Sequence, residues 1–282
     1  MIDRRPGRVA IVTDSTSDVP AEEAARLGVT VIPAVLVVDG KTYLDGPAFS
    51  RTQLYRQMAV LDGLPTTAVP SPGSFVQAYE QELQAGASSI LSIHLAERLS
   101  GMVQTASQAA SEFGGRVEVV DSGQVSLGLG FQVLEAAAAA LAGAPLSAVR
   151  QVARAARDNV RLIAMLNTLE FVRRSGRVSW LRANLGEMLN FKQLVEVVDG
   201  TIRRLDRIRS RSRALQALLA LAAGWGPLSR LAVLHTAVAE EAAAIGQELR
   251  HLASRPPLVV EVTTIIGAHV GPESIGLVGL LA

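Results

Sequence analysis

Side chains with hydroxyl and carboxylate groups gather in a loop that follows the first apolar run of the chain. Thr13-Asp14-Ser15-Thr16-Ser17-Asp18 comes directly after Val9–Val12. Asp14 could be the nucleophile of a phosphatase or hydrolase, but such an enzyme needs a second acid at position 16, where Thr16 stands. Asp and Ser are also preferred helix caps. The simpler interpretation is a loop that satisfies the backbone N–H groups of the next helix.

Two further hydroxyls stand where they could bind an anion. Thr67 belongs to Pro65–Pro72, a segment whose three prolines make it rigid and extended, so that its hydroxyls point in fixed directions. Ser100 precedes Gly101 at the start of a predicted helix. A helix N-terminus offers free N–H groups to an anion, although Ser in that position is most often simply an N-cap.

A histidine and several arginines complete the candidate residues. Gly267–Pro272 is predicted as a glycine-bounded turn that presents His269, whose flanking glycines would let other groups approach the ring. Arg177 lies in a tight turn with neighbouring hydroxyls. The segment Arg203–Arg213 is rich in arginine, and its alternation would place Arg207, Arg209, Arg211 and Arg213 on one face if a strand continues that far. Such a run is usually a solvated face; nucleic-acid binding by a regulator is the alternative.

Composition narrows the possible functions. The chain has 282 residues, enough for two packed domains, and 49% of them are hydrophobic. It contains no cysteine, which excludes disulfides, thiolate metal sites and cysteine nucleophiles. Aromatic residues make up only 4%, and the net charge is +1, so we expect no nucleic-acid partner. The four histidines show no metal-ligand spacing, and we expect no metal and no cofactor.

No segment has the length of a membrane anchor or a secretion signal. The first apolar run, Val9–Val12, is too short for the core of a signal peptide. The most apolar later stretches, Ala136–Leu141 and Ala214–Ala223, are well short of the roughly 20 residues that span a bilayer. We therefore expect a cytoplasmic protein without stable membrane insertion.

The first half of the chain alternates between strands and helices. Short continuous apolar strands separated by helices predict a parallel sheet covered on both faces, with ligands at the carboxyl ends of its strands. The predicted strands are Val9–Val12, Val29–Val38, Ser88–Ile93 and Arg116–Val120, and the helices are Arg51–Leu61, Gly73–Gln84, Gly101–Phe113 and Gly128–Ala142.

The second half mixes hairpins with helices, which favours an α/β domain with antiparallel pairing. Asp199-Gly200 is a strong two-residue turn signal between the strands Leu194–Val198 and Ile202–Arg209. We place the domain boundary at Gly143-Ala144-Pro145, which gives an N-terminal domain of residues 1–145 and a C-terminal domain of 146–282. The other predicted elements are helices at Leu146–Val160, near Trp180–Gly186, at Leu215–Ala223 and at Ala237–Leu252, and strands at Leu162–Leu166, Leu231–Leu234, Val259–Ile265 and Ile275–Leu281.

Taken in order along the chain, these motifs resemble the DegV family of fatty-acid-binding proteins, which includes the lipid-carrying subunits of bacterial fatty acid kinase. Each motif alone is weak, but the ordered series is specific. It consists of Thr13–Asp18, Thr67-Ala68-Val69-Pro70-Ser71, Ser92–Leu95 leading to Leu99-Ser100-Gly101, Val120-Asp121-Ser122 with Gly128-Leu129-Gly130, Ser175–Ser179, Asp199-Gly200 and Gly267–Pro272.

The resemblance implies a two-domain α/β protein with a fatty acid buried between the domains. Thr67 and Ser100 would donate hydrogen bonds to its carboxylate, and His269 would approach it from the second domain. Arg177 and Arg209 would lie near the head group. The chain departs from the family pattern at Ala68, where a serine is usual, and at Lys192-Gln193, where Lys-Pro is usual.

The implied activity is binding rather than catalysis. A chain such as palmitate or oleate would gain about 0.8 kcal/mol for each buried methylene, which is enough for tight binding without a catalytic base. The protein would carry the lipid for transport, or present it to a partner kinase that phosphorylates the carboxylate. We therefore expect no catalytic residue.

Overall fold

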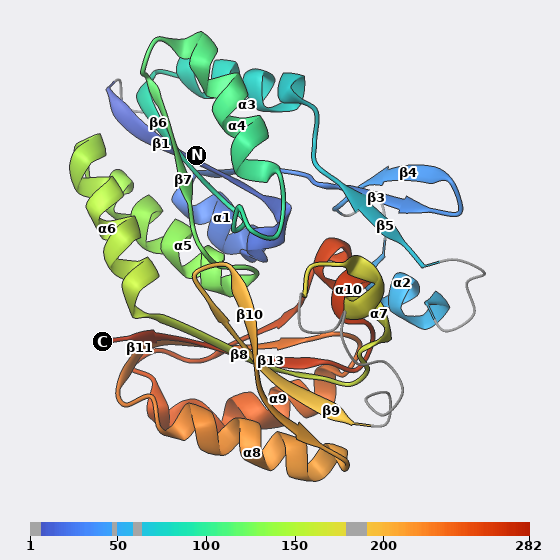
Figure 1. Ribbon diagram of the computed structural model, residues 1–282. Coiled ribbons are helices and arrows are strands. Elements are labelled where there is room, and N and C mark those ends of the chain that lie inside the picture. The colour runs from blue at the N-terminus through green and yellow to red at the C-terminus, as the bar shows by residue number, and fades with distance from the viewer. Residues whose placement is uncertain (1–6, 47–49, 59–63, 179–190) are drawn as a thin grey trace. The chain divides into compact units, whose positions relative to one another are not determined.

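The computed structural model describes residues 7–46, 50–58, 64–178 and 191–282 (Figure 1). Its contacts divide the chain into two compact units. Unit 1 is Met1–Val35 with Ala68–Asn159, and unit 2 is Leu36–Thr67 with Val160–Ala282. The predicted α/β fold class is confirmed, but these bounds differ from the expected 1–145 and 146–282.

Two segments account for the difference in the bounds. Helix α6 (Leu146–Asn159) packs along α5 (Leu127–Leu141) and so belongs to unit 1. Residues 36–67 leave the first unit and contribute three short strands and a helix to the second. The chain returns to unit 1 between Thr67 and Ala68, within the three-proline segment Pro65–Pro72, so this segment marks a boundary that the sequence predicted only as a rigid loop.

The sheet of unit 1 is parallel throughout, as predicted. Its strands are β1 (Arg8–Asp14), β2 (Val29–Ile32), β6 (Ala87–His94) and β7 (Val117–Asp121), in the order β2-β1-β6-β7. The register pairs Thr13 with Ile93 and His94 with Asp121, so the carboxyl ends of three strands lie level at one edge.

Helices cover both faces of this sheet (Figure 1). α3 (Pro72–Gln84) and α4 (Met102–Ala110) lie on one face, and α1 (Ala21–Leu27), α5 and α6 on the other. α5 is buried along most of its length because its sequence is apolar nearly all round. Two 3-10 turns, η1 (Ser15–Ser17) and η2 (Ser111–Phe113), complete the unit.

The predicted strand Val29–Val38 is in fact two strands. Pro33 has no N–H to donate to a ladder, and β2 ends just before it, while β3 (Val35–Val38) begins after it and joins another sheet. β3 pairs with β4 (Lys41–Leu44) and β5 (Thr66–Ala68) in the order β4-β3-β5. Helix α2 (Arg51–Gln57) follows β4, and the rest of the predicted helix, 59–61, lies outside the described residues.

Unit 2 is built on a six-stranded sheet in the order β10-β9-β8-β13-β11-β12. All neighbouring strands are antiparallel except β11 and β12. The strands are β8 (Val160–Leu166), β9 (Lys192–Val198), β10 (Thr201–Ile208), β11 (Leu228–His235), β12 (Leu258–Glu261) and β13 (Ile275–Leu281).

Two apolar clusters hold unit 2 together. The larger cluster includes Leu194, Leu218 and Val233 and involves α8 (Arg211–Ala223) and α9 (Ala239–Glu248), which continues into η4 (Leu249–Leu252). The smaller involves α7 (Glu170–Ser175) and the end of α10 (Thr264–Val270). It consists of Leu166, Leu169, Val172, Val178 and Val195, with Ala164, Ile202 and Val270 packed against it.

The structure corrects two predictions for unit 2. β10 ends at Ile208, and Ser210 accepts a hydrogen bond from the Arg213 N–H to cap α8, so Arg211 and Arg213 lie on a helix rather than on a strand. The strand expected at Val259–Ile265 ends at Glu261 and the expected turn after it is helix α10. The Asp199-Gly200 hairpin is confirmed, and the helix expected near Trp180–Gly186 lies outside the described residues.

Candidate functional site

Within unit 2 the structure brings together two of the residues predicted to bind a carboxylate. Thr67 lies in the middle of β5, and His269 lies in the last turn of α10. The Oγ1 atom of Thr67 is 2.8 Å from the Nε2 atom of His269, across 202 residues of sequence. Both side chains are only partly buried. The pair joins the small sheet to the helix.

Contacts from several segments hold α10 in place. The Asp45 carboxylate accepts hydrogen bonds from the Thr264 N–H (3.3 Å) and from the Thr264 hydroxyl (2.6 Å) at the first turn. The Tyr55 hydroxyl donates to the Val262 carbonyl at 2.8 Å. These tertiary contacts explain why the segment is helical although its glycines predict a turn.

The glycines that flank His269 admit aromatic rings to the backbone. A Cβ at Gly267 would collide with the ring of Tyr55, and one at Gly271 would collide with the ring of Phe171. Gly271 also has a φ of +77°, where a side chain is strained. The space that the glycines leave is therefore filled by these rings, which fix the helix and so orient the imidazole.

His269 is neutral near pH 7. Burial, together with the positive charge of Arg177, lowers its pKa from 6.5 to about 4. A neutral imidazole has one donor and one acceptor nitrogen. His269 can therefore form a hydrogen bond with Thr67, as donor or as acceptor, without placing a charge in this region.

Arg177 lies in the tight turn that the sequence predicted. α7 ends at Ser175, and Gly176 follows with a φ of +70°. The guanidinium donates to the Ser175 carbonyl at 2.6 Å, and the Arg177 N–H donates to the Ser175 hydroxyl at 3.3 Å. The side chain is exposed. The turn thus holds a cation whose field reaches His269.

Ser100 belongs to unit 1, where it precedes the first turn of α4. Gly101, not Ser100, occupies the N-cap position, and no side chain caps the helix there. The expected N-cap role of Ser100 is therefore wrong. Its backbone N–H instead donates to the Ala96 carbonyl at 3.2 Å.

The arginine segment does not form the predicted row. Arg207 and Arg209 stack on one ring, with their guanidinium carbons 5.4 Å and 5.3 Å from the centroid of Phe191. Arg211 instead forms an ion pair with Glu241. The face suggested for nucleic acid is thus divided between a strand and a helix.

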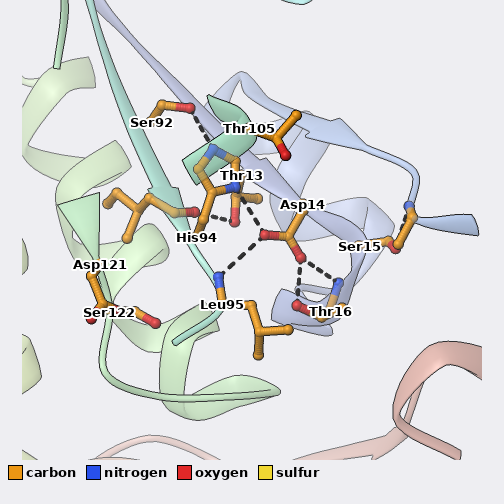
Figure 2. Close-up of polar contacts among 12 residues, drawn as sticks. Thr13, Asp14, Ser15, Thr16, Ser92, His94, Leu95, Thr105, Asp121 and Ser122 are labelled. Carbon is orange, nitrogen blue, oxygen red and sulfur yellow. Dashed lines mark hydrogen bonds and ion pairs between the residues drawn. The ribbon is translucent and has the colours of Figure 1, made fainter. Parts of the chain in front are cut away.

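Asp14 stands at the centre of a buried network in unit 1 (Figure 2). Its Oδ1 atom accepts the Thr16 N–H at 3.0 Å and the Thr16 hydroxyl, so Asp14 caps the 3-10 turn η1. The next helix, α1, has Pro20 at its N-cap and no side-chain cap, so the loop does not cap that helix as expected. The Oδ2 atom of Asp14 accepts His94 Nδ1 at 2.8 Å and the Leu95 N–H at 3.3 Å. All four hydrogen bonds are internal to the protein.

The network continues beyond the histidine. His94 Nε2 lies 2.6 Å from Ser92 Oγ, which lies 2.9 Å from the Tyr79 hydroxyl. Burial raises the pKa of Tyr79 to about 12. The order Asp14, His94, Ser92 matches that of a hydrolytic triad.

None of these side chains is open to a substrate. Asp14, His94, Ser92 and Tyr79 are all fully buried. An external phosphate ester cannot reach the buried Asp14 carboxylate, which contradicts the alternative of a phosphatase or hydrolase using Asp14. The network instead connects the ends of β1 and β6 to α3.

The loops at the carboxyl edge of the parallel sheet bind one another. The Ser126 hydroxyl donates to the Asp18 carboxylate, and its N–H donates to the Thr16 carbonyl at 2.9 Å. The Ala96 N–H donates to the Gln124 carbonyl at 3.0 Å. Much of the polarity that suggested ligand binding in these loops therefore serves to connect them.

The described part of the chain has neither a cluster of metal-binding side chains nor a membrane-spanning helix. Across residues 7–46, 50–58, 64–178 and 191–282, no three His, Asp or Glu side chains are grouped so that they could hold a metal ion. Within the same ranges, no helix is long and apolar enough to cross a membrane.

The chain is similar to known proteins along nearly its whole length. The sequence model of a family described as "Uncharacterised protein, DegV family" matches residues 8–281. A DegV domain-containing protein of Deinococcus radiodurans is 38% identical over 273 residues, covering 95% of this chain and 97% of its own. One from Streptomyces coelicolor is 34% identical, with 96% and 97% covered.

Solved structures agree with these matches. A DegV family protein from Thermus thermophilus, described by its fatty acid binding, superposes with a TM-score of 0.90 at 34% identity, over 98% of this chain and 100% of that one. DegV from Bacillus subtilis, described as a fatty acid binding protein, gives a TM-score of 0.86 at 28% identity, over 98% and 100%.

Proposed function

Because the chain belongs to the DegV family, we propose that it binds one long-chain fatty acid, such as palmitate or oleate, in a buried tunnel and does not transform it. The pairing of Thr67 with a neutral His269 at 2.8 Å is the observation that carries the proposal. Two relatives at 34% and 28% identity that are described as fatty acid binding support it.

The pair suits a carboxylate because it can present a donor in a fixed direction. If His269 carries its proton on Nε2, it donates to Thr67 Oγ1, and the Thr67 hydroxyl is left to donate to the ligand. A hydrogen bond to a charged group contributes about 1.5–3 kcal/mol. The imidazole in this scheme sets the direction of the hydroxyl.

Other residues have supporting roles in the proposal. Ser100 would donate a further hydrogen bond to the carboxylate. Arg177 would attract the anion, since its positive charge already acts on His269. Arg209 is proposed as a more distant head-group residue, although its guanidinium stacks on Phe191. Ala68 offers no hydroxyl of its own.

The acyl chain would supply most of the affinity. Burial of each methylene contributes about 0.8 kcal/mol. A protein that only binds its ligand needs no catalytic base, metal or cofactor. Its role would be to shield the lipid from water. We propose that it acts in the cytoplasm, where it either transports the lipid or presents the carboxylate to a partner kinase for phosphorylation.

Mass spectrometry of the purified protein tests the proposal directly. Spectra recorded under native conditions should show a mass increase that corresponds to one long acyl chain, and extraction should identify the acid. After removal of lipid, added palmitate or oleate should bind with a 1:1 stoichiometry. A lipid-free protein that ignores both acids would refute the proposal.

A further inference from the structure

Gln193 is a buried amide in unit 2 whose two polar atoms both lack a hydrogen-bond partner. The side chain is fully buried, and neither Nε2 nor Oε1 is bonded to any group in the part of the chain that the structure describes. Buried polar side chains nearly always have a partner, so each exception needs an explanation.

The strand register shows which face of the sheet Gln193 occupies. Leu194 pairs with Met165 across β9 and β8, and both belong to the large cluster that involves α8 and α9. Side chains alternate along a strand. Gln193, which pairs with Leu166, therefore lies on the opposite face, together with Leu166 and Val195.

That face carries the smaller apolar cluster. Leu166 and Val195 pack there with Val172, Val178 and Val270. Val178 follows Arg177, and Val270 follows His269. The amide thus belongs to an apolar wall that ends next to two of the proposed head-group residues.

The nearest side chains by register do not satisfy the amide. Leu166 on one neighbouring strand is apolar, and Arg207 on the other directs its guanidinium over the ring of Phe191. No group in the described part of the chain therefore satisfies this amide, which leaves a bound ligand as a candidate partner.

The chemistry of the amide indicates what that group is. Nε2 is a donor and Oε1 is an acceptor. A carboxylate only accepts and would leave Oε1 unpaired, whereas a hydroxyl both donates and accepts. We propose that the preferred ligand is a long-chain fatty acid with a hydroxyl on its chain, and that Gln193 recognises this hydroxyl. The inference rests on the proposed function and adds the substrate class.

Binding measurements on lipid-free protein test this specificity. Palmitate is compared with hydroxypalmitates substituted at carbon 2, at carbon 3 and near the middle of the chain. Two neutral hydrogen bonds together favour at least one isomer over palmitate by about tenfold. Gln193→Met should remove this preference and leave palmitate affinity within about twofold.

Gln132→Met provides a matched control, because Gln132 is also fully buried but donates to the Ser122 and Gly128 carbonyls of unit 1. This variant should lose stability and keep the preference for the hydroxylated acid. A wild-type protein that binds palmitate and every isomer equally well, or a Gln193→Met variant that keeps the preference, would overturn the inference. Failure to bind any acid would instead refute the proposed function.

Stability without ligand is an independent readout. Gln193→Met replaces an unpaired amide with an apolar side chain of similar length, so the lipid-free variant should melt at the same temperature as the wild type or higher. A clearly lower melting temperature would show that the amide has a partner within the protein and would overturn the inference.

Discussion

His94 donates through Nδ1 to the Oδ2 atom of Asp14 at 2.8 Å, although 80 residues separate the two side chains in sequence. The two residues end neighbouring parallel strands, β1 and β6. Neighbouring positions of this kind often bind ligands in open α/β sheets. In this protein both side chains are buried, and their hydrogen bond stabilises the fold.

Asp14→Asn should lower the free energy of unfolding by about 3 kcal/mol, since an amide nitrogen would face a donor in a fully buried network. Urea unfolding followed by circular dichroism measures the change. Asp39→Asn is the control: Asp39 is exposed in a turn with a φ of +48°, which Asn adopts well, so its effect should be close to zero. Equal midpoints for both variants would contradict the structural role of Asp14.

Thr67→Val should weaken fatty acid binding by roughly tenfold to a hundredfold, which corresponds to the loss of one charge-assisted hydrogen bond. Valine keeps the shape of threonine and its preference for strands. Thr66→Val is the matched control, because Thr66 precedes Thr67 on β5 and is exposed. Displacement of a fluorescent fatty acid gives both affinities. Similar losses in the two variants would argue against Thr67 as the head-group donor.

The stability of the protein should depend on the protonation of His269 in mildly acidic solution. Its pKa is about 4 in the folded protein against 6.5 without the fold, so between these values the unfolded chain holds a proton that the folded protein lacks. The His269 contribution is therefore complete above pH 6.5 and is lost as the pH falls towards 4, with a limit of about 3 kcal/mol.

His269→Gln isolates this contribution, because glutamine does not titrate in that range. The difference in unfolding free energy between wild type and variant should become smaller from pH 7 to pH 4. Chemical denaturation at closely spaced pH values measures it, and NMR of the imidazole gives the pKa itself. A constant difference across this range would exclude a depressed pKa for His269.

Gly271→Ala should destabilise unit 2 and weaken lipid binding, since the new methyl group would collide with the ring of Phe171 next to His269. Gly226→Ala is the control: Gly226 has a similar φ of +85° but open space around the Cβ position. Both variants lose about 1–2 kcal/mol from backbone strain. Gly271→Ala alone adds an overpacking penalty of about 1–3 kcal/mol and the loss of affinity.

Short sequence signals such as turn dipeptides and prolines predict several turns and strand ends of this fold. Asp199-Gly200 indicates a hairpin, and the structure has one with positive φ at both residues. Asp39-Gly40 carries the same signal and also has positive φ at both residues, but the apolar run before it obscured the turn. Pro33 could likewise have revealed the break between β2 and β3.

Other features depend on tertiary contacts and have no local signature. Gly267–Val270 is helical because Asp45 caps the helix and because Tyr55 packs on its backbone. The partnership of Asp14 and His94 follows only from the order of the strands. Only the resemblance to a known family predicts that Thr67 and His269 lie close together, because no spacing rule connects residues so far apart in sequence.

The discontinuity of unit 2 has a consequence for the protein during its synthesis. Thr67 leaves the ribosome 202 residues before His269. At about 5–20 residues per second, that interval is roughly 10–40 s. Unit 1 is complete at Asn159, so it can fold before the rest of unit 2, from Val160 to Ala282, has been synthesised. The nascent chain therefore cannot form the proposed carboxylate-binding pair of Thr67 and His269 until translation is almost finished.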